Sequence, residues 1–153
     1  MEANRILYLS PEDSVELFPT NTSSNFVVEF DKAIKLPSEC YVDLVEFRGM
    51  MSDRSRETIY IMSDICQNSI VFGTQAPILR AVSLAGVRRV SQEFVTPFKV
   101  RVCTDELKRC RIYLRARDFK ELSFEVSEVE LTLRLSWPHP SGGMTSGNVI
   151  LTA

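Results

Sequence analysis

The side chains best suited to metal binding or catalysis are scattered along this sequence. The four cysteines, Cys40, Cys66, Cys103 and Cys110, form no Cys-x-x-Cys pair, and none has a histidine nearby because the only histidine is His139. Zinc sites combine cysteine and histidine ligands at short, regular spacings. We therefore expect no metal site and interpret the cysteines as free thiols, mostly buried, in a reducing compartment.

Other reaction chemistries have no better candidates. His139 lies between Pro138 and Pro140, and no motif places a nucleophile beside it. Residues 141–147 include three glycines but no lysine, and no helix pattern follows, so a phosphate-binding loop is excluded. Asp43 and Glu46 are predicted on opposite sides of one strand and would not form a carboxylate pair. We expect no enzymatic activity, no cofactor and no small-molecule substrate.

The most informative charge pattern is a basic stripe in residues 109–117. Its odd positions are Arg109, Arg111, Tyr113, Arg115 and Arg117, and its even positions are Cys110, Ile112, Leu114 and Ala116. A period of two predicts a strand with one basic face and one core face. The basic face is either an ordinary solvated surface or a docking site for an acidic neighbour, whose carboxylates arginine can bind bidentately. Nucleic acid is a less favoured partner, because Tyr113 is the stripe's only aromatic side chain.

Residues 126–137 predict a second strand of the same kind. The inward positions are Val129, Leu131, Leu133, Leu135 and Trp137, and the outward ones are Glu128, Glu130, Thr132 and Arg134. If both strands lie in one sheet, the arginines of the first could pair with the glutamates of the second.

The elements that must position these residues are short and extended. Residues 25–30 alternate as a half-buried strand, and residues 41–47 are apolar on both sides, which predicts a central strand covered on both faces. Between the first strand and residue 25, Val15, Leu17 and Phe18 are expected to pin a turn-rich segment across the core.

Later segments are also predicted as strands, except for residues 104–108. The run around Pro97 predicts a strand with a bulge or a switch between sheets, and residues 104–108 predict one helical turn. About eight or nine strands with long connections favour an all-β, two-sheet β-sandwich in the form of a single jelly roll of about eight strands.

Composition sets the limits of this chain. Its 153 residues, 44% of them hydrophobic, suffice for one core, which we place in residues 1–137 as a single domain, with a flexible tail over 138–153. The 20 acidic and 18 basic residues nearly cancel, which disfavours a dedicated nucleic-acid binder. We find no signal peptide and no apolar run long enough to span a membrane.

Several short motifs, in order over about residues 8–135, resemble a family of small proteins encoded by Polinton/Maverick elements and related adintovirus-like DNA viruses. The motifs are Phe18-Pro19-x-Asn21-Thr22 with Phe26, Val42-x-Leu44-x-Glu46-Phe47, Ile59-Tyr60-Ile61, Asp64-Ile65-Cys66 with Ser69, Pro77-Ile78-Leu79-Arg80, Arg109-x-Arg111-Ile112-Tyr113-Leu114-Arg115, and Leu131-x-Leu133. Tyr41 stands where family members often carry tryptophan, and residues 86–93 match no family motif.

The resemblance implies a minor capsid, penton-like protein: a single jelly roll that forms a ring, expected to be a homopentamer, and contacts double jelly-roll major capsid proteins. It also implies synthesis inside the host cell and a place in the virion. Ring formation needs unlike side surfaces. Candidate surfaces are the charged loop over residues 50–56, which includes Arg54 and Arg56, the basic stripe, and the terminal residues Val149, Ile150 and Leu151. The terminal residues either add to a neighbour as an edge strand or stay disordered or folded back on their own subunit.

The alternative is a non-enzymatic β-sandwich module that recognises a protein or a glycan through its loops. Such a module predicts a concave, aromatic-rich site, and the sequence suggests that few aromatic side chains are exposed.

Overall fold

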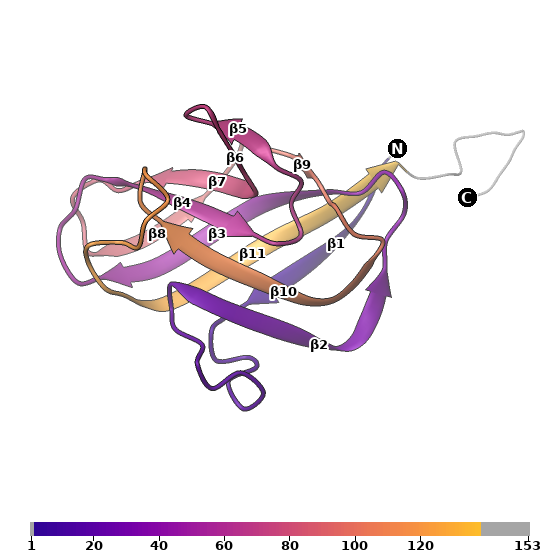
Figure 1. Cartoon of the computed structure of the whole chain (residues 1–153), viewed down its shortest axis with the longest axis horizontal. Helices are drawn as coiled ribbons and strands as arrows, with labels where there is room; N and C mark the ends of the chain where they lie inside the picture. The colour runs from indigo at the N-terminus through magenta and orange to yellow at the C-terminus, as the bar shows by residue number, and fades with distance from the viewer. Residues whose placement is uncertain (1, 139–153) are drawn as a thin grey trace, which may run out of the picture.

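The computed structural model describes residues 2–138, which form eleven strands and no helix (Figure 1). The strands are β1 (Glu2–Leu9), β2 (Asn25–Lys35), β3 (Tyr41–Met51), β4 (Thr58–Ser63), β5 (Ser69–Val71), β6 (Thr74–Ala76), β7 (Ile78–Ser83), β8 (Arg89–Glu93), β9 (Val100–Arg101), β10 (Glu106–Arg115) and β11 (Val126–Pro138). Within these residues no helix could cross a membrane.

Two antiparallel sheets form a sandwich with the strand order of a jelly roll. The first sheet has the order β1-β11-β3-β8, with β9 also paired to β3, and the second has the order β2-β10-β4-β7. The pairs β1–β11, β2–β10, β3–β8 and β4–β7 are nested in sequence and alternate between the sheets. This is the path of a long antiparallel ribbon rolled on itself. The predicted all-β jelly roll is confirmed, with the β5–β6 hairpin inserted between β4 and β7.

The core lies between the sheets and follows the predicted alternation. Cys110, Ile112 and Leu114 of β10 face it with no exposed surface, as do Leu133 and Leu135 of β11. Burial of each large apolar side chain contributes about 2 kcal/mol to the stability of the fold. The largest fully buried side chains are Phe26, Phe47, Leu44, Met51, Ile59, Ile61, Leu79, Leu107, Ile112, Leu114, Leu131 and Leu133.

A β-bulge in β3 corrects the prediction for its two faces. Leu44 pairs with Leu133 and Glu46 pairs with Thr132, so Val45 is the extra residue. Past the bulge the alternation is reversed, and Glu46 therefore lies on the same outward face as Asp43. The prediction that the two carboxylates lie on opposite sides is wrong. The central position of β3, between β11 and β8, is confirmed, but its outward face is polar.

The strands β10 and β11 belong to different sheets. The arginines of β10 therefore do not pair with the glutamates of β11, a pairing expected only if both strands lie in one sheet. Arg109 of β10 instead pairs with Glu29 of β2, at 2.9 Å. Glu130 of β11 lies 3.8 Å from Arg48 of β3. The ion pairs that these two strands do form are made within their own sheets, because neighbours on one face of a sheet are within reach of each other.

Two predictions of local structure are decided by long-range pairing. The helical turn predicted at residues 104–108 is wrong: β10 begins at Glu106, and the buried Leu107 pairs with Ile34 of β2. Of the two alternatives given for the run around Pro97, the switch between sheets is wrong, because β8 and β9 on either side of residues 94–99 both pair with β3. Burial and pairing outweigh local propensity at both places.

The connection between β1 and β2 carries the side chains of Val15 and Leu17 outward. The buried Ser14 accepts a 2.9 Å hydrogen bond at Oγ from the backbone N–H of Glu29, and this contact anchors the segment. Val15 and Leu17 are 44% and 62% exposed, so the prediction that they pin the core is wrong; only Phe18 is partly buried. The segment projects from the bottom of the sandwich in Figure 1.

Candidate interaction surfaces

The buried thiols offer no reactive group. Cys40, Cys66 and Cys110 are buried and Cys103 is exposed, all as free thiols. Burial raises the pKa of Cys110 to about 12, opposed by the hydrogen-bonding contact with Ser63, and burial also raises the pKa of Cys66 and of Cys40. Protonated thiols are poor nucleophiles and poor metal ligands. Within residues 2–138 no three Cys, His, Asp or Glu side chains are placed to share a metal ion.

Four residues of the basic stripe project from β10 as predicted, and Arg117 lies in the turn just beyond the end of the strand; we call Arg109, Arg111, Tyr113, Arg115 and Arg117 the basic face. Arg111 Nη1 donates a 2.7 Å hydrogen bond to Asn25 Oδ1, and the Arg115 guanidinium lies 5.3 Å from the centre of the Tyr113 ring. Burial raises the pKa of Tyr113, and the charge of Arg115 opposes the shift. In the described part of the chain, Arg111, Arg115 and Arg117 form no ion pair.

Next to Arg117 lies an open hollow of about 700 Å³, which we call the aromatic hollow. Its lining residues are Arg56, Glu57, Thr58, Tyr60, Phe72, Ala116, Arg117 and Asp118. The Arg117 guanidinium lies 4.2 Å from the centre of the Phe72 ring, a cation–π contact. The Tyr60 ring meets Phe72 edge to face at 5.7 Å and Phe119 at 6.4 Å.

The aromatic hollow is built with unfavourable backbone geometry. Phe72 and Gly73 form the two-residue connection of the β5–β6 hairpin, and their φ angles are 52° and 77°. Such turns favour asparagine, aspartate or glycine, because a bulky side chain at positive φ costs about 1 kcal/mol or more. Phe119, the second ring in contact with Tyr60, has a φ of 65°. Strained residues that persist in pairs at one surface point to a function there.

The charged loop predicted as an interface joins this region. Arg56 lines the aromatic hollow together with Arg117, although the two are far apart in sequence. Arg54 and Arg56 also line a neighbouring open hollow of about 580 Å³ with Phe124. The structure therefore brings Arg56 and Arg117 to one site, whereas Arg109 lies apart, over the Phe18 ring at 5.6 Å.

The predicted tail residues lie outside the part of the chain that the structure describes. They are Val149, Ile150 and Leu151, and β11 ends at Pro138, which pairs with Glu2.

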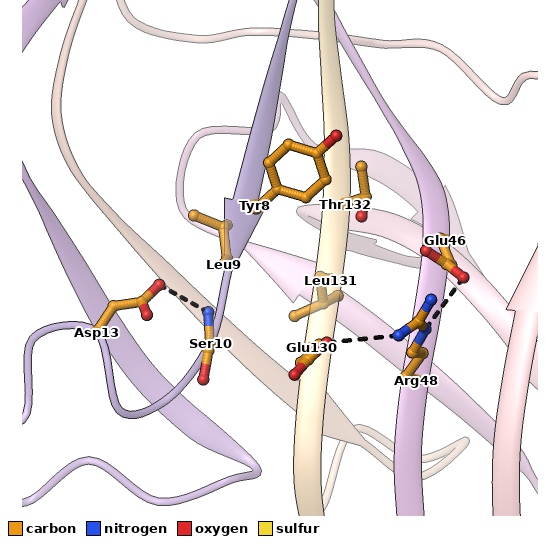
Figure 2. Close-up of a pocket in the computed structure, with 9 residues that line it drawn as sticks. All are labelled: Tyr8, Leu9, Ser10, Asp13, Glu46, Arg48, Glu130, Leu131 and Thr132. Atoms are coloured by element: carbon orange, nitrogen blue, oxygen red, sulfur yellow. Dashed lines mark hydrogen bonds and ion pairs between the residues drawn. The ribbon is translucent and has the colours of Figure 1, made fainter.

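A further hollow, of about 350 Å³, lies on the outward face of the first sheet, and we call it the acidic groove. Figure 2 shows its lining: Tyr8, Leu9, Ser10, Asp13, Glu46, Arg48, Glu130, Leu131 and Thr132. Arg48 lies between two carboxylates, 3.1 Å from Glu46 and 3.8 Å from Glu130 (Figure 2). Asp13 lies at the other side and accepts a 2.9 Å hydrogen bond from the Ser10 N–H. Three carboxylates and one arginine leave the groove net acidic.

Sequence reasoning missed the exposed aromatic side chains of the aromatic hollow and of the acidic groove. Phe72 is 53% exposed and Tyr8 is more exposed still, so the expectation that few aromatics are exposed overlooked them. A Phe-Gly pair between two short extended runs was the available signal for a hairpin. The position of that hairpin beside Tyr60 depends on pairing between distant strands and has no local signal.

No protein-family model matches the sequence, and a search of curated proteins finds no match.

Proposed function

We propose that this chain is a structural minor capsid protein, a penton-like subunit that assembles into a ring, as a pentamer, and contacts double jelly-roll major capsid proteins. The observation that carries the proposal is the nested jelly-roll strand pairing, together with the ordered motifs that resemble proteins of Polinton and adintovirus-like elements. Jelly rolls are common in viral capsids, and they also occur in lectins and cupins, so the fold alone does not identify the function.

The surface chemistry supports an assembling subunit. Subunits of a ring meet through two different surfaces, because each contact joins one side of a copy to the other side of the next. This chain carries unlike surfaces on its two sheets: the basic face on β10 of the second sheet, and the acidic groove on the first sheet. Unlike charge on two sides favours head-to-tail association and disfavours pairing of identical faces.

Sedimentation velocity of the full chain tests the proposal. We expect a discrete species with about five times the 17.4 kDa protomer mass. We also expect its population to fall as salt is raised, because screening weakens the charged contacts. A protein that stays monomeric up to high protein concentration would contradict the ring. Imaging of particles that contain the chain tests the vertex position, which requires density for it at the fivefold axes.

The aromatic hollow favours one second candidate, a binding module for a separate protein or glycan. An open cavity lined by aromatic rings and arginines is a common form of recognition site. This candidate predicts a monomer that binds its ligand with a 1:1 stoichiometry. Sedimentation of the chain alone separates the two functions before any ligand is known.

A further inference from the structure

We infer that the aromatic hollow of one copy receives the acidic turn segment, residues 11–17, of the next copy. The inference deepens the proposed function and rests on it, because it names the two surfaces that meet when the chain assembles. Two independent sets of observations carry it: within residues 2–138, arginines without ionic partners at the hollow, and carboxylates without ionic partners at the segment.

The hollow side presents positive charge beside an exposed ring. Arg56 and Arg117 line the cavity, and among the described residues neither forms an ion pair. A guanidinium that is already stacked on an aromatic ring keeps its N–H groups free in the plane of the fork. Arg117 is held in this way by Phe72. The site therefore suits a carboxylate flanked by apolar groups.

The segment side has the complementary composition. Glu12, Asp13 and Glu16 are exposed and form no ion pair within the described residues, although Asp13 and Glu12 accept local hydrogen bonds from Ser10. Val15 and Leu17 on the same segment are exposed. Carboxylates that alternate with exposed aliphatic side chains match a cavity that combines arginines with rings.

Geometry assigns the contact to two copies. None of residues 11–17 lines the hollow of its own chain. The segment projects at the bottom of Figure 1, whereas the β5–β6 hairpin with Phe72 lies at the top. A contact between unlike sites on separate sides is heterologous, and it propagates from copy to copy as a ring requires.

Charge on the hollow also selects against a polyanion. Glu57 and Asp118 line the cavity beside the arginines, and the whole chain has a net charge of −2. A nucleic-acid groove needs a continuous positive surface to track the phosphates. A short acidic peptide segment, with carboxylates at only a few positions, avoids the two acidic side chains.

Mixing two charge-reversed variants tests the contact. Arg56→Glu/Arg117→Glu reverses the positive charge of the hollow, and Glu12→Lys/Glu16→Lys reverses the negative charge of the segment. Each variant alone is expected to sediment as a monomer, and an equimolar mixture as species of two or more 17.4 kDa protomers, because the intact hollow of one variant receives the intact segment of the other and their reversed charges are also opposite in sign. The matched controls Lys32→Glu/Lys35→Glu and Asp31→Lys/Glu39→Lys change exposed charges elsewhere and should assemble as the parent chain does. Variants that assemble normally, or a mixture that stays monomeric, would overturn the inference.

A peptide assay separates this inference from the proposed ring. The probe is a fluorescent peptide of residues 10–18, and the receptor is the Glu12→Lys/Glu16→Lys variant, whose hollow is open. We expect saturable binding by anisotropy that weakens about tenfold or more when Arg56→Glu/Arg117→Glu is added, and that also weakens with Phe72→Asn. If the parent chain is monomeric, the ring is contradicted and this assay alone decides the inference. No peptide binding, or tighter binding of a single-stranded oligonucleotide than of the peptide, would overturn it.

Discussion

Arg134 holds Asp43 in a two-pronged ion pair on the outward face of the first sheet. Arg134 Nε donates to Asp43 Oδ1 at 3.2 Å and Nη2 donates to Oδ2 at 2.9 Å, and the two residues are cross-strand partners of β11 and β3. The Asp43 side chain is only 1% exposed, whereas that of Arg134 is 31% exposed. Among residues 2–138, Arg134 is the only charged partner of this carboxylate, and it takes the place of water.

We predict that Arg134→Met destabilises the fold by about 2 kcal/mol, because it leaves a buried carboxylate unpaired. This predicted loss of stability is smaller than the loss expected for a fully buried ion pair, because solvent reaches part of the Arg134 side chain. Urea unfolding measures the change. The double variant Asp43→Leu/Arg134→Met should lose less stability than Arg134→Met alone, and an equal or larger loss would show that the pair has a different role.

The buried thiols should lower the free energy of unfolding as the pH rises into the alkaline range. The pKa of Cys110 rises from 9.0 to about 12 on burial, so the folded state keeps a proton that the unfolded state releases above pH 9. The stabilisation is complete below pH 9 and is lost as the pH rises toward 12, by up to about 1.4 kcal/mol per pH unit per thiol. Urea unfolding between pH 8 and 10.5 should show this slope. Cys110→Ala should flatten it, whereas the exposed Cys103→Ser should not.

The β5–β6 hairpin allows stability to be separated from recognition. Gly73 has a φ of 77°, and a Cβ there would meet nothing within 4 Å, so Gly73→Ala should cost about 1 kcal/mol through backbone conformation alone. Phe72→Asn relieves similar strain but loses the contacts with Tyr60 and Arg117, so stability should change by less than about 1 kcal/mol. Thermal unfolding measures both variants. A loss of several kcal/mol for Phe72→Asn would show that the Phe72 side chain has a structural role only.

Neighbouring residues of β10 should respond in opposite ways. Leu114 has no exposed surface, and Leu114→Ala should cost about 3 kcal/mol through the lost burial and the cavity left behind. Arg115 lies on the outward face, and Arg115→Ala should change stability by less than about 1 kcal/mol. Comparable losses at both positions, measured by urea unfolding, would contradict the two-faced strand.

Sequence reasoning was most successful where a strand's own side chains carried the information. The basic and apolar faces of β10, the inward row of β11 and the all-β sandwich were all predicted, because alternation with a period of two is a local property of an extended chain. The same reasoning failed at residues 104–108, where helix-forming residues lie in a strand, and at Val15 and Leu17, which point to solvent.

By itself, then, the sequence determined which side of each long strand is apolar, and hence that two sheets must enclose one core. The tertiary structure alone decided which strands are neighbours. It placed β10 and β11 in different sheets, inserted a bulge at Val45 that turns Glu46 toward Asp43, and carried Phe72 to Tyr60 and Arg117. The physical reason is that partners in a jelly roll are chosen by burial and hydrogen bonding between segments far apart in the chain, and a local pattern contains no record of that choice.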